Sequence, residues 1–497
     1  MVLLSSCKQK PAVEETESRY AELVNKFAEV SLEADLTHLS ANDIEAVKIL
    51  FEVADIMNEL FWIQAYGDKE ELMSKITDEQ ARRYAMIHYG PWDRLNNMEP
   101  FVEGFGAKNA GANFYPSDMT KEEFEAWDSP NKSSLYTMIR RNDEGQLVAI
   151  WYKDFFAAQI TKATELMKKA AELATDEGFK HYMNKRIEAM LTDDYLESDM
   201  AWMDMKTSPI DFIVGPIENY EDRLFGYKAA YEAFILIKDI EWSQKLERYA
   251  TLLADLQRGL PVEPKYKSEI PGADSDMNVY QVIYYAGDCN AGSKTIAINL
   301  PNDERVHTSK GSRKLQLKNA MQAKFDKILV PISELLIAEE QRQYIKFDAF
   351  FENVMFHEVT HGMGIKNVVG KKGTTVRNAL KEAYSPIEEA KADIMGLYLV
   401  SKLRENGEIT EGELMDNFVT FVAGIFRSVR FGASSSHGKA NMMRFNYFME
   451  KGAIERREDG TYFVNYDKMY DAMISSVQQI LIIQGDGNYD TAVKLIE

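Results

Sequence analysis

Apolar and polar residues recur with helical spacing along much of the N-terminal half. The periodicity from residue 41 to about 64, and again from 153 to 191, indicates amphipathic helices that each bury one face. The pattern then changes to runs of β-branched and aromatic residues at 278–285 and 295–300, with a turn-forming stretch at 287–292 between them. We therefore expect two strands that are neighbours in a small sheet.

A helix-rich pattern returns from about residue 309 to 401 and continues to the C-terminus. A dense apolar pattern predicts a long, largely buried helix; its residues are Phe347, Phe350, Phe351, Val354, Met355, Val359 and Met363. A second helix is expected to begin at Ser385 as N-cap, with Pro386 in the first helical position and Glu388 completing a capping box. The fold class is therefore mainly α with a smaller β portion (α+β).

The first predicted helix contains the sequence His357-Glu358-Val359-Thr360-His361. Positions i and i+4 lie on one face of a helix, so both imidazoles can bind a single zinc ion. Glu358 lies beside them and can take a proton from a zinc-bound water. With 7 His and 79 acidic residues in 497, about 0.016 such matches are expected by chance. The motif predicts a zinc hydrolase.

A zinc site of this kind needs a third protein ligand. The second helix offers three carboxylates, Glu388, Glu389 and Asp393. One can bind metal while the others hold the free ring nitrogens of the two histidines. Acidic residues in a first helical turn are also common because they interact favourably with the helix dipole, so the residues alone leave both interpretations open.

The pair of helices resembles the dipeptidyl peptidase III metallopeptidases, in which a zinc-binding His-Glu helix is followed by a Glu-Glu-Cys-Arg-Ala-Glu helix. Here the second motif reads Glu388-Glu389-Ala390-Lys391-Ala392-Asp393. Other segments also resemble the family: 90–95, 111–116, 215–222 and 298–302. The resemblance implies two lobes flanking a wide cleft, with zinc on the helical lobe. It also implies that Glu389 is the third zinc ligand, with Glu388 and Asp393 behind the histidines.

The resemblance also implies roles in substrate binding. Asn299 and Asn302 correspond to residues that hold the N-terminal end of a peptide, and His437 corresponds to a histidine that stabilises the reacting carbonyl oxygen. The expected reaction is release of dipeptides from the N-terminus of short peptides.

The chain departs from the family pattern at two points. Its zinc motif has five residues, whereas most members have six. A tyrosine that many members place before the segment 215–222 is replaced, near Ile213. Either Tyr220 substitutes for it or that hydrogen bond is absent.

Length and composition are those of a large soluble enzyme with more than one lobe. The expected division is a tether at 1–17, a mixed lobe at 18–230 and 265–308, and a helical catalytic lobe at 231–264 and 309–497. A net charge of −21 argues against a nucleic-acid partner, since phosphate binding requires a basic face. The two cysteines provide no disulfide framework, and no apolar run has the length of a membrane span.

Cys7 ends the sequence Leu4-Ser5-Ser6-Cys7, which resembles a bacterial lipobox. A lipid on this cysteine would attach the protein to a membrane in the bacterial cell envelope, and this location is favoured over the cytoplasm. Only three residues precede the box, so the alternatives are a truncated signal and an ordinary chain terminus.

Two rival functions stay open. The first keeps zinc-dependent peptide hydrolysis but changes the specificity to that of an aminopeptidase or an endopeptidase. The second is an envelope peptide-binding lipoprotein with weak catalysis, which the replaced tyrosine suggests. Glu358 favours an enzyme, because a pure binding protein has no use for a general base.

Overall fold

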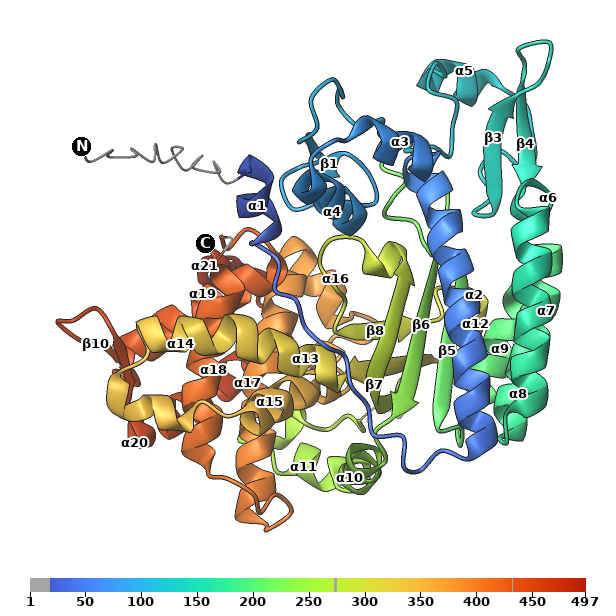
Figure 1. The fold of residues 1–497 in the computed structure, drawn as a ribbon. Helices are drawn as coiled ribbons and strands as arrows, with labels where there is room; N and C mark the ends of the chain where they lie inside the picture. Colours follow the sequence, from blue (N-terminus) through green and yellow to red (C-terminus); the bar gives the residue numbers. More distant parts are fainter. Residues whose placement is uncertain (1–17, 272–274, 431) are drawn as a thin grey trace, which may run out of the picture.

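A computed structural model describes residues 18–271, 275–430 and 432–497 (Figure 1). Cys7 and the predicted tether lie outside the described residues. Two hydrophobic cores, centred on a sheet and on a bundle of helices, define a mixed lobe and a helical lobe. The predicted α+β class with two lobes is confirmed.

The mixed lobe is built on a five-stranded sheet with the order β5-β6-β7-β9-β8. The strands are β5 (Ile210–Glu218), β6 (Ala230–Lys238), β7 (Ser275–Gly287), β9 (Ser312–Leu317) and β8 (Ala297–Leu300). β5 and β6 are buried along almost their whole length, as expected of strands covered on both faces. β7 and β9 are parallel, whereas the other neighbours are antiparallel. β8 therefore lies at an edge of the sheet.

Helices cover this sheet, and the longest is α2, which packs against β5, β6 and β7 (Figure 1). The capping box at its start joins Ser40 and Asp43. The helices of this lobe are α1 (Arg19–Val24), α2 (Ala41–Ala65), α3 (Lys69–Lys75), α4 (Glu79–His88), α5 (Lys121–Ala126), α6 (Tyr152–Phe155), α7 (Ala157–Leu173), α8 (Glu177–Thr192), α9 (Leu196–Asp204), η2 (Asp288–Asn290) and α12 (Glu304–Lys310). Two small hairpins add β1 (Trp92–Asp93) with β2 (Glu99–Pro100), and β3 (Thr137–Arg141) with β4 (Leu147–Trp151).

The helical lobe is a bundle around α17, which is buried on most sides and contacts α15, α18, α19 and α20. The helices of this lobe are α10 (Ile240–Ala250), α11 (Leu253–Arg258), η1 (Pro264–Tyr266), α13 (Lys318–Lys324), η3 (Phe325–Leu329), α14 (Val330–Leu336), η4 (Glu339–Tyr344), α15 (Phe347–Thr360), α16 (Val376–Leu380), η5 (Lys381–Ala383), α17 (Tyr384–Glu405), α18 (Leu414–Val429), α19 (Ser436–Glu450), α20 (Tyr466–Asp486) and α21 (Tyr489–Ile496). A hairpin of β10 (Ile454–Arg456) and β11 (Tyr462–Val464) lies at its edge.

Two details of the sequence prediction were wrong. β7 and β8 are not neighbours, because β9 lies between them in a region predicted to be helical. The strand β9 has only six residues between two helices, so its alternation gives little signal. α17 begins at Tyr384 and not after Ser385, because η5 runs directly into it and no side chain caps it. The region 153–191 is helical as predicted and contains α6, α7 and α8.

The lobe boundaries also differ from the predicted division. Residues 231–238 and 312–317 were assigned to the helical lobe, but both form strands of the sheet. Lys318 Nζ lies 3.0 Å from Asp239 Oδ2, at the two points where the chain leaves the sheet for the helical lobe. In the part of the chain that the structure describes, no helix is both long and apolar enough to span a bilayer.

The contact between α15 and α17 depends on a glycine. A Cβ atom at Gly396 would lie 2.8 Å from the backbone nitrogen of His357 and 2.9 Å from the carbonyl carbon of Phe356. These are backbone atoms, so they cannot move aside without moving the helix. Gly396 therefore allows the two helices to approach at the position of the first motif histidine.

Gly396→Ala is expected to lower the free energy of unfolding by about 1–3 kcal/mol, because it forces two packed helices apart. Urea unfolding followed by circular dichroism measures this. Gly424→Ala in α18 is the matched control, since a Cβ there meets nothing within 4 Å. The control should be neutral or more stable by up to ~1 kcal/mol. Equal urea midpoints for Gly396→Ala and the parent would contradict this account of the helix contact.

Candidate active site

The last turn of α15 carries His357 and Glu358, and His361 follows as its C-cap residue. The backbone of His361 is still right-handed helical (φ −58°, ψ −32°), so the i, i+4 geometry is kept. The two imidazoles face each other with Nε2 atoms 3.1 Å apart. Two ring nitrogens at this distance can share one cation.

Glu389 on α17 completes a triangle with these nitrogens. Its Oε2 atom lies 3.3 Å from Nε2 of His357 and 3.7 Å from Nε2 of His361. This oxygen is buried and makes no hydrogen bond of good geometry within the described residues, but ring nitrogens of His357, His361 and His437 lie 3.1–3.7 Å from it. A buried carboxylate oxygen among imidazole nitrogens is stabilised when a cation is bound between them.

Two other carboxylates of α17 hold the opposite side of each ring. Asp393 Oδ1 is 2.5 Å from Nδ1 of His357, and Glu388 Oε1 is 3.1 Å from Nδ1 of His361. Such contacts orient a metal-binding imidazole so that Nε2 carries the free lone pair. Glu388 and Asp393 therefore lie on the Nδ1 side of the two histidines.

Sequence reasoning missed the residues that support these carboxylates. Arg444 Nη2 contacts Asp393 Oδ2, and Lys391 Nζ lies 2.7 Å from Glu388 Oε1. Gln484 Nε2 donates to Glu388 Oε2 at 2.9 Å. Arg444 and Lys391 are almost fully buried. A charged residue on an otherwise buried helix face was the available signal, but it does not identify its partner.

The electrostatics of the cluster favour a cation. Burial lowers the pKa of His357, but the carboxylates of Asp393 and Glu389 outweigh burial and raise it to about 10. Burial raises the pKa of Glu388, but Lys391 and His361 lower it to about 2. Burial also opposes ionisation of Glu389, whose pKa is nevertheless lowered by His357 and His437. The carboxylates are therefore ionised at neutral pH, and a divalent cation can replace the protons on the imidazoles.

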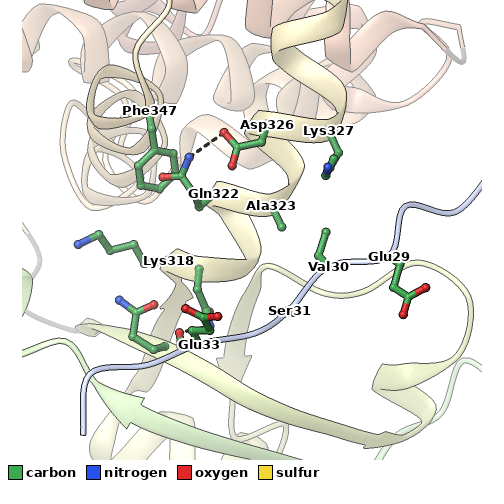
Figure 2. A pocket seen from close by; sticks show the side chains of 12 residues that line it. Glu29, Val30, Ser31, Glu33, Lys318, Gln322, Ala323, Asp326, Lys327 and Phe347 are labelled. Atoms are coloured by element: carbon green, nitrogen blue, oxygen red, sulfur yellow. Dashed lines mark hydrogen bonds between the residues drawn. The ribbon is translucent and has the colours of Figure 1, made fainter. Parts of the chain in front are cut away.

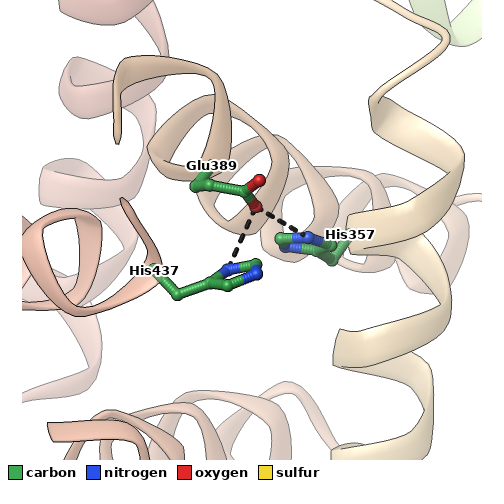
Figure 3. A group of neighbouring side chains, drawn as sticks. All are labelled: His357, Glu389 and His437. Carbon is green, nitrogen blue, oxygen red and sulfur yellow. Dashed lines mark ion pairs between the residues drawn. The ribbon is translucent and has the colours of Figure 1, made fainter. Parts of the chain in front are cut away.

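His437, at the start of α19, forms a second triplet with His357 and Glu389 that could also hold a metal ion (Figure 3). Its Nδ1 atom lies 3.1 Å from Glu389 Oε2, and its side chain is 62% exposed. Zinc with ligands at about 2.0–2.1 Å in tetrahedral geometry separates donor atoms by about 3.3–3.4 Å. The separations of 3.1, 3.3 and 3.7 Å among His357, His361 and Glu389 fit this value. In the triplet with His361, the Nδ1 atoms of both histidines also contact carboxylates, Asp393 and Glu388. This triplet is therefore the better metal site.

Glu358 forms an ion pair with the sheet. Its Oε2 atom lies 3.1 Å from Nζ of Lys314 on β9. Lys314 is paired in the sheet with Asn299 on β8, and cross-strand partners point to the same face. This contact between the lobes places the metal cluster opposite the edge strand, at the level of Asn299.

Asn299 lies on β8 and Asn302 follows it, whereas Tyr220 follows β5. The Asn299 side chain is exposed, and Asn302 Nδ2 donates to the carbonyl of Ile217 at 3.3 Å. Tyr220 is 72% exposed, and its pKa is raised by the charge of Glu218 and by burial. Ile213 is buried within β5, so its side chain is not available to a substrate.

Sequence reasoning also missed a group of carboxylates near Tyr220. Glu218, Glu232 and Asp288 lie close enough to one another that burial and their mutual charge raise the pKa of Glu232 well above its usual range. Burial and the charges of Glu221 and Glu218 raise the pKa of Asp288 to about 7, against the opposing charges of Arg94 and Lys108. A positively charged group would be stabilised here. The predicted site residues therefore form two groups, one around the metal cluster and one at the end of β8.

The architecture and this cluster are those of a metallopeptidase. A model of peptidase family M49 matches residues 121–368. The structure of DPP III from Caldithrix abyssi has 41% sequence identity and a TM-score of 0.88, covering 96% of this chain and 93% of that one. Dipeptidyl-peptidase III from Corallococcus sp. strain EGB has 34% identity and a TM-score of 0.73, covering 96% and 91%.

Two further relatives are similar in sequence. Nudix hydrolase 3 of Arabidopsis thaliana is 34% identical over 97% of this chain and 71% of its own length. Dipeptidyl peptidase 3 of Dictyostelium discoideum is 23% identical over 66% of this chain and 54% of its own. The chain belongs to the dipeptidyl peptidase III family, peptidase family M49. It is a metallopeptidase of that type.

Asp393→Asn is expected to weaken metal binding about 10- to 100-fold, because the amide no longer supplies the charge that orients His357. Titration of the metal-free protein with zinc in the presence of a competing chelator measures the affinity. Asp471→Asn on α20 is the control, since this carboxylate is exposed. Affinity equal to that of the parent would show that Asp393 has no such role.

Proposed function

We propose that the protein is a zinc-dependent peptidase that releases dipeptides from the N-terminus of short peptides. Peptide hydrolysis follows from the family; zinc and the dipeptide product are the parts that we propose. The observation that supports zinc most directly is a triangle of three possible ligand atoms. They are Nε2 of His357, Nε2 of His361 and Oε2 of Glu389, which makes no hydrogen bond within the described residues. Its size and its imidazole and carboxylate ligands suit zinc.

A bound zinc ion would polarise the scissile carbonyl and make an attacking water more acidic. Glu358 is then the general base that takes the proton from this water, and it passes a proton to the leaving amine. His437 lies beside Glu389, and its side chain is exposed. Its imidazole can therefore donate a hydrogen bond to the carbonyl oxygen of the substrate as negative charge develops on that oxygen. Asp393 and Glu388 keep the two zinc-binding imidazoles in place.

The register of the sheet supports release of dipeptides. An extended peptide can add to the free edge of β8, with its amino group beside Asn302 and the acidic group of Glu218, Glu232 and Asp288. Glu358 is level with Asn299 through Lys314. The three residues from 302 to 299 span about 10 Å when the chain is extended. This is the length of a dipeptide together with the peptide bond that follows it.

The location of the protein is a separate hypothesis, because Cys7 lies outside the described residues. We propose attachment to the cell envelope through a lipid on Cys7, which resembles a lipobox cysteine. Metabolic labelling with a fatty acid should mark the natural chain and spare its Cys7→Ala variant. Equal labelling of both would refute lipid attachment at this residue.

Glu358→Gln is expected to reduce turnover at least about a thousandfold while the zinc content is unchanged, because only the general base is lost. Mass spectrometry of peptide products and elemental analysis of the protein measure the two quantities. Glu450→Gln on the exposed side of α19 is the control and should keep parental activity. Removal of zinc from the parent by a chelator should abolish turnover, and re-addition should restore it. Turnover by metal-free protein would contradict the proposal.

Extending a peptide by one residue at its N-terminus should move the cleaved bond by one residue, so that the product is again a dipeptide. N-acetylation of the same peptides should lower kcat/KM about a hundredfold, because it removes the positive charge that the acidic group stabilises. Product masses distinguish the rivals. An aminopeptidase releases single residues, an endopeptidase cleaves the same internal bond in both peptides, and a binding protein cleaves neither.

A further inference from the structure

Three cations lie together at the other end of the edge strand, and the proposed mechanism does not use them. They are Lys324 at the end of α13, Arg427 on α18 and Arg430 after it, and we name them the basic cluster. Lys324 Nζ donates to the carbonyl of Lys294 at 2.6 Å, three residues before β8 begins. Arg430 is exposed and donates through Nη1 to the carbonyl of Arg427.

These cations are close enough to repel one another. Burial lowers the pKa of Lys324 to about 8, together with the charges of Arg427 and Arg430. Burial and Arg430 also lower the pKa of Arg427. The Nε atom of Arg427 is buried without a hydrogen-bond partner among the described residues, and its guanidinium lies 5.5 Å from the centre of the Phe350 ring.

No carboxylate of the described chain contributes to the pKa of Lys324 or Arg427, although the protein has a net charge of −21. Placing cations beside one another is unfavourable in the free protein, and an anionic ligand would offset this repulsion. The basic cluster therefore has the charge and the unpaired donor expected of an anion-binding site.

Lys324 is not among the residues of α13 and η3 that line a neighbouring cavity. Lys318, Gln322 and Lys327 line a cavity of about 460 Å³ beside the N-terminal segment 28–36 (Figure 2). Position 324 is roughly 160° around the helix from the middle of that face. Its ammonium therefore belongs to the side where Lys294 leads into β8.

The direction of the bound peptide connects this cluster to the substrate. A peptide with its amino group at Asn302 and paired antiparallel to β8 runs towards Ala297 and then Lys294. Its C-terminus therefore approaches the basic cluster after passing Glu358. Lys294 lies five residues from Asn299, about 16 Å along a strand, and lysine and arginine side chains extend back along part of this distance.

We propose that the basic cluster binds the C-terminal carboxylate of the peptide substrate, and this inference rests on the proposed dipeptide release. The amino group and the carboxylate are then recognised at opposite ends of one strand.

The test is binding of a hexapeptide as free acid and as C-terminal amide to protein with Glu358→Gln, in which neither peptide is cleaved. The acid should bind about tenfold more tightly than the amide, and the ratio should shrink at high salt. Lys324→Met and Arg430→Gln should each reduce the ratio to below about threefold. Arg430 is exposed, so the second variant tests the site even if the first does not fold.

Lys327→Met is the matched control, because Lys327 lies three residues from Lys324 but lines the other cavity. It should keep the tenfold ratio. Equal affinity for acid and amide in the parental background, or a full ratio in both Lys324→Met and Arg430→Gln, would overturn the proposal.

A third peptide distinguishes the two sources of a carboxylate. It is amidated but ends in glutamate. Affinity like that of the plain amide supports recognition of the terminal carboxylate. Affinity equal to that of the free acid would overturn that assignment, because the basic cluster would then bind acidic side chains. Because binding is measured without turnover, failure of dipeptide release and failure of carboxylate binding are separate results.

Discussion

The packing of α15 against α17 is the contact on which the active site depends. Gly396 lets the two backbones approach at His357, and within the two preceding turns of α17 three carboxylates face the imidazoles of α15. Buried carboxylates are unfavourable unless each has a cation or a donor. Arg444 supplies one for Asp393 and Lys391 supplies one for Glu388. Glu389 has only the imidazoles, so its free oxygen and theirs define where a metal ion belongs.

The second lobe gives this cluster its relation to a substrate. The contact of Lys314 with Glu358 joins the sheet to the helical lobe, and the pairing of β8 with β9 fixes which strand residues lie opposite the cluster. Beyond one end of β8 Asn302 contacts Ile217, which precedes Glu218, and before the other end Lys324 contacts Lys294. A short peptide has the complementary charges at its own two ends. The edge strand therefore orients the chain, while the helical lobe supplies the chemistry.

Much of this site was predictable from sequence because helical spacing is local. His357, Glu358 and His361 are fixed by i, i+4 geometry, and α2 and α15 followed from apolar periodicity. The choice of Glu389 over Glu388 and Asp393 needed the family resemblance, since all three lie on one helix face. Residues brought together from distant segments were not predictable: Arg444 behind Asp393, Lys314 on the short strand β9, and Lys324 beside Arg427. Their positions depend on tertiary packing, which a single sequence does not encode in any local pattern.

The central claim is that one zinc ion is bound by His357, His361 and Glu389. The most direct measurement is anomalous diffraction at the zinc edge from crystals of the zinc-loaded protein. The account predicts a single strong peak about 2.0–2.1 Å from Nε2 of both motif histidines and from a Glu389 oxygen. A peak bound by His357, Glu389 and His437, with His361 outside the coordination sphere, would contradict it.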